Sequence, residues 1–151
     1  MGGIKGKIRP VKVLIDTNII LDVALERQPY FEASEQILAF AEQGRIVGYI
    51  SASTFGDLYY ILRKDKGRAS SLEFLRNIAD FCQVATVDQT VISMALTANF
   101  KDFEDAIQYS TAAVNHLDAV VTRNPKDFVG ATLRVTTPET LIQELTQNKL
   151  K

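Results

Sequence analysis

The chain has 151 residues, of which 46% are hydrophobic and 23% are charged, a length and composition typical of one globular domain. Its formal net charge of −1 excludes the class of nucleic-acid-binding proteins that depends on a strong overall positive charge. We expect a single domain over residues 11–146, preceded by a flexible basic N-terminal tail (residues 1–10) and followed by a frayed C-terminus (residues 147–151).

The few cysteine and histidine residues limit the kinds of metal site and disulfide that the chain can form, and its short apolar runs limit where in the cell we expect it. The single cysteine, Cys82, cannot form an internal disulfide, and no cluster of cysteine and histidine could hold zinc. We expect Cys82 to be a small buried apolar residue and the lone His116 to have a capping or surface role. The N-terminus has no apolar run long enough for a signal peptide, and no segment approaches the ~20 apolar residues of a membrane-spanning helix. We therefore expect a soluble protein of the reducing cytoplasm, with no membrane contact.

The first half of the chain alternates short apolar runs with helical patterns. Residues 11–15 (VKVLI) and 46–50 (IVGYI) are β-branched and mostly apolar, which predicts buried parallel strands. Between them, apolar residues at helical spacing predict two helices, which Pro29 separates and Gly44 ends.

The rest of the chain repeats this alternation. Ser51 and Ser53 are candidate N-caps for a helix that carries Asp57. The other predicted elements are, in chain order, helix 70–81, strand 83–86, a helix capped by Asp88, helix 103–114, strand 119–122 and a fifth strand at 133–135. Helix 103–114 is expected to pack through Ala106, Ile107, Ser110 and Ala113. The alternation is typical of an α/β fold with a mostly parallel sheet of four to five strands, flanked by helices on both faces.

Acidic residues follow the predicted strands. In an open α/β sheet, ligands bind outside the carboxyl ends of the strands. Asp16 comes directly after the first strand. Asp57 and Asp127 lie shortly after the second and fourth strands, and Asp105 lies at the start of a later helix. We expect these four carboxylates to converge at one end of the sheet.

A cluster of this kind has the chemistry of a metal site. Converging carboxylates repel one another, and burying them without compensation is costly, so such a cluster generally holds a cation. Oxygen ligands select Mg²⁺ or Mn²⁺, ions that bridge protein carboxylates to substrate phosphates. A bound ion can activate water and stabilise a leaving oxygen, so the scarcity of histidine is no objection. The residues therefore predict a metal-dependent phosphodiester hydrolase.

Four stretches, in order along the chain, resemble the signatures of a known family. They are VLIDTN with Asp16, ISASTFGDLYYIL with Asp57, FEDA with Asp105 and VTRNPKDF with Asp127. Together they are similar to PIN domains of the toxin-type, VapC-like branch, over residues 11–145. The resemblance implies a PIN-like fold and a Mg²⁺- or Mn²⁺-dependent endoribonuclease that hydrolyses RNA phosphodiester bonds. It also implies a homodimer that serves as the toxin of a type II toxin–antitoxin pair and is inhibited by an antitoxin protein.

The resemblance also implies roles for individual residues. The catalytic acids and metal ligands would be Asp16, Asp57, Asp105 and Asp127, and the residues that orient ligands or water would be Asn18, Thr122 and Asn124. Two positions differ from the family pattern, which more often has glutamate in place of Asp57 and often an acid in place of Asn124. The side chain of Asp57 is one methylene shorter than glutamate, so we expect it to reach the metal through water.

Several of these residues also have simpler interpretations. Asp16 could merely cap the following helix, and Asp105 could be a first-turn acid favoured by the helix dipole. Asp22 is expected to face solvent or to close the edge of the pocket. Arg123 and Lys126 adjoin the proposed site and are expected to bind substrate phosphate, although Arg123 could equally pair with a local carboxylate.

Aromatic and basic residues outside these motifs have structural interpretations too. The tyrosines expected in the core or at an interface, rather than as base-stacking platforms, are Tyr59, Tyr60 and Tyr109. The basic group expected at the polar end of a helix and loop, with RNA contact as the lesser alternative, is Arg63, Lys64, Lys66 and Arg68.

The sequence lacks the signatures of several other α/β protein families. A Rossmann dehydrogenase needs a glycine-rich turn after the first strand, and a P-loop enzyme needs a glycine-rich run ending in Lys-Ser or Lys-Thr; neither is present. A phospho-aspartate phosphatase normally has a second aspartate in the place of Asn18, and a receiver domain has an acidic pair at the end of its first strand. The alternative that stays open is a PIN-like binding or scaffold module without catalysis.

Overall fold

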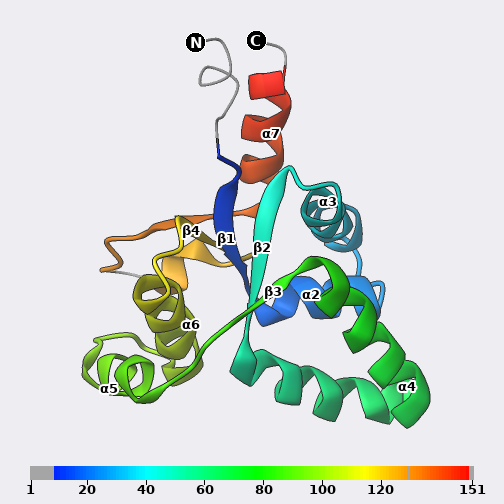
Figure 1. Ribbon diagram of the computed structural model, residues 1–151, viewed down its shortest axis with the longest axis horizontal. Coiled ribbons are helices and arrows are strands. Elements are labelled where there is room, and N and C mark those ends of the chain that lie inside the picture. The colour runs from blue at the N-terminus through cyan, green and yellow to red at the C-terminus, as the bar shows by residue number, and fades with distance from the viewer. Residues whose placement is uncertain (1–8, 129, 150–151) are drawn as a thin grey trace.

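The protein, a computed structural model that describes residues 9–128 and 130–149, is built on one parallel sheet (Figure 1). The strand order is β3-β2-β1-β4-β5, and every neighbouring pair is parallel. The strands are β1 (Val11–Ile15), β2 (Ile46–Ser51), β3 (Gln83–Ala85), β4 (Ala119–Val121) and β5 (Arg134–Thr136). The predicted α/β class is confirmed, with five strands that are parallel throughout.

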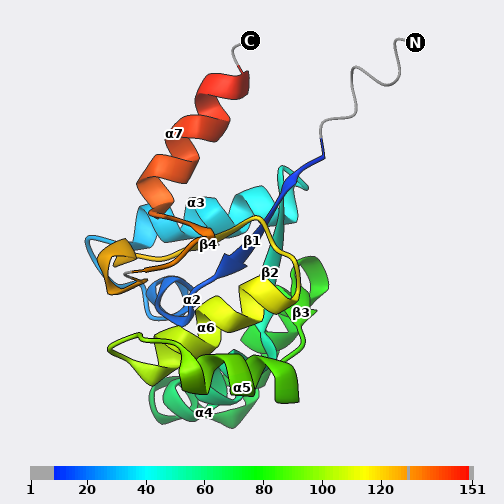
Figure 2. The same cartoon turned by 90° about the vertical axis from the view of Figure 1, so that its left-hand side faces the viewer.

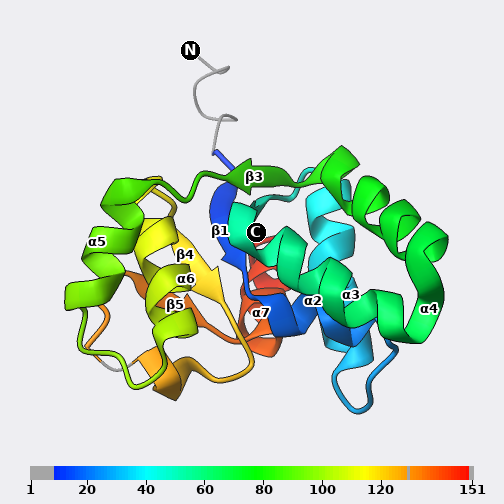
Figure 3. The same cartoon turned by 90° about the horizontal axis from the view of Figure 1, so that it is seen from below.

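Helices cover both faces of this sheet (Figures 1 and 3). Their bounds are α2 (Thr17–Ala24), α3 (Phe31–Glu42), α4 (Ala52–Phe81), α5 (Gln89–Thr97), α6 (Phe103–Val114) and α7 (Pro138–Lys149), with a 3₁₀ turn, η1 (Pro125–Phe128). Helices α2, α3, α4 and α7 lie on one face, and α5 and α6 lie on the other. The two helices predicted on either side of Pro29 are present as α2 and α3, and the helix predicted after the Asp88 cap is α5.

The central strand β1 contributes side chains to both cores. Val13 and Ile15 pack in the larger core, which the α2, α3 and α4 side supplies. Leu14 points the other way and packs in the smaller core, which includes Ala112 of α6. The side chains of Val13, Leu14 and Ile15 are all fully buried. A strand buried on both faces reads as a continuous apolar run, so VKVLI was recognisable in the sequence.

Gly48, in the middle of β2, lets helix α3 approach the sheet closely. A Cβ at this position would lie 3.0 Å from Ile15 Cδ1, 3.1 Å from Ala41 Cβ and 3.2 Å from Cys82 Sγ. We expect Gly48→Ala to lower the free energy of unfolding by about 1–3 kcal/mol, because the core around it is already filled. The measurement is urea denaturation. Gly56→Ala is the matched control, since a Cβ there meets nothing within 4 Å; equal stabilities for the two variants would contradict this account.

Helix α4 contains both helices that were predicted between residues 52 and 81. Gly67 interrupts it with φ 81° and ψ 173°, a conformation that favours glycine. The two arms form a V in Figure 1: the first leads away from β2, and the second returns to β3. Ser51 caps the first arm and accepts a hydrogen bond from the Ser53 amide, as predicted.

Helix α7 has no counterpart among the predictions. It begins at Pro138, and the Thr137 hydroxyl accepts a hydrogen bond from the Thr140 amide, so ordinary start signals were present. Its residues Leu141, Ile142 and Leu145 pack against the larger core, next to α3 (Figure 2). The helix runs to Lys149, beyond the expected domain boundary at residue 146. The rest of the expected frayed C-terminus (150–151) and most of the expected N-terminal tail (1–8) lie outside the described residues.

Cys82 and His116 lie away from the end of the sheet where the acids were expected. Cys82 is buried, and burial raises the pKa of its thiol to about 12, which confirms its prediction as a buried apolar residue. His116 is exposed, just after α6. Within the described ranges, no helix is long and apolar enough to cross a membrane.

Candidate active site

A cavity of about 760 Å³ lies at the carboxyl end of the sheet, where the strand order reverses between β1 and β4. Figure 3 looks onto this end of the molecule, with α6 on one side of β1 and the first arm of α4 on the other. The cavity is lined by all four predicted acids, Asp16, Asp57, Asp105 and Asp127, and by the predicted supporting residues Asn18, Thr122 and Asn124. The topological switch point is where open α/β sheets bind ligands, and it is the end of the sheet at which the four acids were expected to converge.

Asp16 is held rigidly at the floor of this cavity. Its Oδ1 accepts hydrogen bonds from the Thr17 amide (2.9 Å) and Gln108 Nε2 (3.2 Å), and its Oδ2 accepts one from Thr122 Oγ1 (2.9 Å). It also caps α2, which confirms the capping interpretation, and it lines the cavity; its role as a metal ligand stays a prediction. Only 7% of the residue is exposed, and burial raises the pKa of Asp16, although these hydrogen bonds oppose the shift. The carboxylate is thus fixed and costly to ionise.

Gln108 is a site residue that the sequence analysis missed. It is 6% exposed, lines the cavity, and donates through Nε2 to Asp16 and to Thr17 Oγ1 (3.2 Å). Among the described residues, its buried Oε1 has no hydrogen-bond partner. The expected packing face of α6 included Ile107 and Ala113, which are only half-buried, whereas Gln108 is buried. The available signal was a polar side chain one turn after Asp105; apolar periodicity alone placed it outside the packing face.

Hydroxyl groups connect α2 with the first turn of α4. Thr17 Oγ1 and Thr54 Oγ1 lie 3.0 Å apart, and Thr54 is buried at the cavity wall. This contact places the start of α4, and with it Asp57, beside the end of β1. Neither threonine was singled out from the sequence, because an isolated Thr in a helix start is indistinguishable from an ordinary cap.

Asp105 has the most perturbed carboxyl group of the site. Its pKa is raised to about 7, mainly by burial and further by the negative charges of four cavity-lining acids: Asp16, Asp102, Asp127 and Glu104. Asp102 also caps α6 by accepting a hydrogen bond from the Glu104 amide. Negative charge is therefore concentrated around Asp105, and this disfavours the ionised form of its carboxyl group.

This shift predicts a pH-dependent stability for the metal-free protein. The unfolded Asp105 carboxyl titrates near 3.8 and the folded one near 7, so between these values the folded state keeps a proton that the unfolded chain has lost. Stability should therefore fall as the pH rises from about 4 to about 7. Asp105→Asn should flatten this slope in urea denaturation with EDTA, whereas Asp80→Asn, an exposed change on α4, should keep it. Identical slopes for wild type and Asp105→Asn would refute the shift.

Asp57 and Asp127 reach the cavity from the solvent side. Both are exposed, Asp57 on the first arm of α4 and Asp127 on η1. Asp57 is thus exposed, but it lines the cavity. In residues 9–128 and 130–149, no three acidic, histidine or cysteine side chains lie close enough to hold a metal by themselves. The four acids thus share one cavity without forming a compact set of direct ligands.

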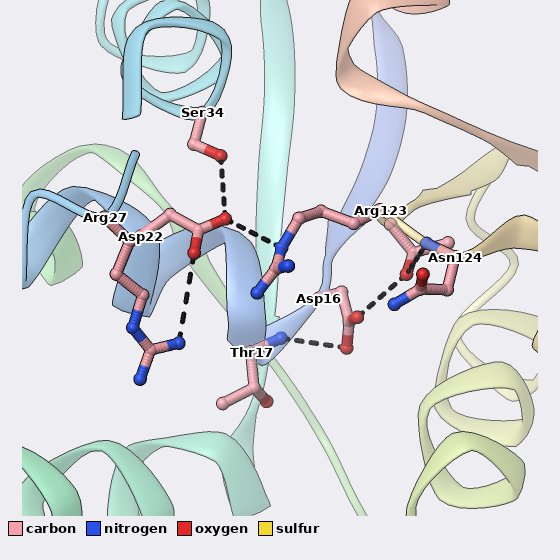
Figure 4. A network of polar contacts seen from close by, with 8 residues as sticks. Asp16, Thr17, Asp22, Arg27, Ser34, Arg123 and Asn124 are labelled. Atoms are coloured by element: carbon pink, nitrogen blue, oxygen red, sulfur yellow. Dashed lines mark hydrogen bonds and ion pairs between the residues drawn. The ribbon is translucent and has the colours of Figure 1, made fainter. Parts of the chain in front are cut away.

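Asp22 was expected at the surface or the pocket edge, and this expectation is wrong. Its side chain has no exposed area, and its Oδ2 lies 2.9 Å from Arg123 Nε and accepts from Ser34 Oγ (3.3 Å), as Figure 4 shows. Arg27 lies 3.9 Å from the other oxygen. The countercharge comes from a residue 101 positions later, so local sequence could not reveal that this carboxylate is buried.

Arg123 was expected either to bind substrate phosphate or to pair with a carboxylate, and the structure shows the ion pair, with Asp22. Besides contacting Asp22, its guanidinium lies 3.9 Å from the ring centroid of Tyr30, and it does not line the cavity. Its charge nevertheless acts on the pKa of Asp16, which it lowers in opposition to burial. Lys126 is exposed on η1 and also does not line the cavity. Phosphate binding by these two residues stays a prediction.

Comparison with known proteins agrees with this geometry. A family model described as PIN domain matches residues 12–126, a range that includes Asp16, Asp57 and Asp105 and ends just before Asp127. The ribonuclease VapC1 of Aquifex aeolicus is 30% identical over 132 residues, which cover 85% of this chain and 91% of that protein.

Solved structures are similar over most of their length. A chain of a toxin–antitoxin complex from Klebsiella pneumoniae superposes with a TM-score of 0.64 at 26% identity, covering 83% of this chain and 97% of that one. A chain of DNA-bound VapBC from Salmonella typhimurium has the same TM-score at 17% identity, covering 85% and 98%, and so shares the fold. With the family model and the VapC1 relative both spanning most of the sequence, the chain belongs to the PIN-domain family, in its VapC-like branch.

Proposed function

We propose that this protein is a divalent-metal-dependent endoribonuclease and the toxin of a type II toxin–antitoxin pair. The observation that carries the proposal is the single cavity shared by Asp16, Asp57, Asp105 and Asp127 at the switch point of the sheet. The similarity to a ribonuclease over 85% of the chain supports the choice of RNA as substrate. The substrate and the single reduced cysteine suit a cytoplasmic location.

The residues of the cavity fit Mg²⁺ or Mn²⁺. The available donors are carboxylate oxygens and the unpartnered Gln108 Oε1, all hard ligands. The repulsion that raises the pKa of Asp105 is what a divalent cation would relieve. Because no three acidic side chains within the described part of the chain lie close enough to hold a metal by themselves, the fit is to a hydrated ion held directly by Asp16 and Asp105. Asp57 and Asp127 would act through water, since Mg²⁺ usually keeps several waters.

When bound, such an ion would supply the positive charge that neutralises the attacked phosphate and favours ionisation of a nucleophilic water. The chain's own residues hold Asp16 in one orientation through Thr17, Gln108 and Thr122. The backbone amide of Asn124 donates a hydrogen bond to Thr122 Oγ1 (3.2 Å), which keeps that hydroxyl directed at Asp16. This preorganisation matters because catalytic groups must be held before the reaction begins.

The direct test is cleavage of mixed structured and single-stranded RNAs by the purified chain with Mg²⁺, Mn²⁺ or EDTA. We expect cleavage with either ion and none with EDTA. Isothermal titration calorimetry with each ion separately measures whether the cavity binds metal. Cleavage that persists in EDTA would exclude the proposed chemistry. Metal binding without cleavage of any RNA would favour the alternative of a catalytically silent binding module.

The biological role needs a second measurement. A toxin of this kind should arrest growth when expressed alone in a bacterial host, and a co-expressed antitoxin should restore growth by occupying the cavity. The Klebsiella relative was solved as a toxin–antitoxin complex, which supports the choice of partner. We also propose a homodimer, which sedimentation velocity would test. Growth that continues during expression of an active nuclease would argue against the toxin role.

A further inference from the structure

The rim of the acidic cavity carries large apolar side chains that no core requires. Tyr60 and Ile61 of α4 and Phe103 of α6 all line the cavity, and they are 56%, 37% and 47% exposed. We refer to these three residues as the apolar rim. Tyr60 was expected in the core or at an interface, and its exposure excludes the core.

The apolar rim is attached to the same helices as the acids. Tyr60 lies three residues after Asp57, so the two project from one face of α4. Phe103 lies two residues before Asp105, in the first turn of α6. The two helices lie on opposite sides of β1 at this end of the sheet (Figure 3). The cavity therefore has an acidic floor and aromatic groups on two sides of its opening.

Positive charge accompanies the aromatic groups. Lys64 Nζ lies 4.4 Å and Arg63 Cζ 5.6 Å from the ring centroid of Tyr60. Neither forms an ion pair with any residue in the described ranges, and neither lines the cavity. Both are exposed. Tyr60 thus lines the cavity and has two exposed cations over its ring.

We propose that the apolar rim is a subsite for an unpaired nucleobase, with Arg63 and Lys64 binding the neighbouring phosphates. This inference rests on the proposed ribonuclease function, because it supposes that the scissile phosphate lies over the acidic floor. Aromatic side chains stack on any base whose face is free, whereas bases within a duplex are already stacked on their neighbours. Arg63 and Lys64 complement the phosphates beside such a base and so favour RNA over an acidic protein segment. The carboxylates of the cavity lining would face the scissile phosphate through the proposed cation.

The test uses the Asp16→Asn background with Mg²⁺, so that RNA is bound but not cut. The probes are a short single-stranded RNA with a fluorescent label and the same strand annealed into a duplex, both measured by fluorescence anisotropy. We expect Tyr60→Ala and Phe103→Ala each to weaken single-strand binding by about five- to a hundredfold. Tyr60→Phe should keep the affinity. Leu96→Ala, an exposed apolar change outside the cavity (68% exposed), is the matched control and should have no effect.

Two further readouts separate stacking from charge. An RNA that carries 2-aminopurine should lose fluorescence on binding, and Tyr60→Leu should reduce this quenching, because leucine has no ring and only that of Phe103 remains in the apolar rim. The Arg63→Gln, Lys64→Gln double variant should reduce the slope of log affinity against log salt by about 0.7 per charge removed. It should leave the quenching at saturation intact.

The outcomes distinguish failure of the subsite from failure of the function. If the wild type cleaves RNA but Tyr60→Ala and Phe103→Ala bind and cleave like it, the subsite is wrong and the ribonuclease stands. If the wild type cleaves no RNA, the function fails, and the anisotropy series still decides the subsite. Equal binding of duplex and single strand would overturn the proposal. It would be overturned equally by a change in self-association, seen by sedimentation velocity, with no change in RNA affinity.

Discussion

Asp16→Asn should reduce metal-dependent RNA cleavage by at least about a hundredfold, since loss of even an outer partner of a metal ligand typically costs about 10- to 100-fold. The same variant should unfold no more easily than the wild type. Asparagine keeps an oxygen for the Thr17 amide and Gln108, and the Thr122 hydroxyl can accept from the new amide instead of donating. Burial raises the pKa of Asp16, so the neutral side chain also removes a charge that the fold stabilises poorly.

This pair of results separates a functional acid from a structural one. A purely capping Asp16 would lose stability on substitution and leave any activity proportionate to the folded fraction. A functional acid loses activity while stability is kept or increased, as at sites where function opposes stability. The measurements are cleavage rates with Mg²⁺ and urea denaturation on the same preparations. Asp80→Asn serves as the control for a neutralised exposed carboxylate. Undiminished cleavage by Asp16→Asn would remove the leading residue of the proposed site.

Asp22→Asn should lower the free energy of unfolding by about 3 kcal/mol, because it leaves the partly buried Arg123 without its countercharge. The Asp22 side chain is fully buried and that of Arg123 is 20% exposed. We place the cost at the lower end of the range for broken buried pairs, since Arg123 keeps some contact with water. Chemical denaturation at neutral pH measures the change.

A double-mutant cycle assigns this cost to the pair. Asp22→Asn combined with Arg123→Gln should cost less than the sum of the single variants, because neither charge is then left alone. Glu144→Gln is the matched control: its partner Arg134 forms a surface ion pair, with the two side chains 41% and 45% exposed. That change should cost less than about 1 kcal/mol. Additive effects at Asp22 and Arg123 would show that the pair contributes no coupling.

The fold was predictable where one segment carries its own signal. VKVLI is mostly apolar, with buried side chains on both faces of the sheet, so β1 was expected at the residues where it is found. Helix 103–114 was expected at its observed bounds, since Asp102 caps its start. Strand β5 lies one residue later than expected, because three residues at a sheet edge leave the register to pairing with β4. Helix α7 had a Thr-Pro start and apolar residues at helical spacing, signals that sequence reasoning should have used.

The site was predictable in its acids and unpredictable in its partners. Asp16, Asp57 and Asp127 follow from the rule that sites form at the carboxyl ends of strands, whereas Asp105, at the start of a helix, was singled out by the resemblance to PIN domains; the structure brings all four to one cavity. Gln108 was missed because a glutamine in a helix is ordinarily exposed, and only contact with Asp16 explains its burial. Tyr60 was assigned to the core or an interface because apolar residues usually pack, yet it stands at the cavity opening.

By itself, the sequence determined the α/β class, the order of most elements, the four acids that line the cavity and the family resemblance, because these depend on residue type and local spacing. The tertiary structure alone decided which charges are buried in pairs and which side chains face the cavity. Asp22 and Arg123 lie 101 positions apart in the chain and 2.9 Å apart in space. The energy of a charge depends on its distance to other charges and to water, and those distances exist only once the chain has folded.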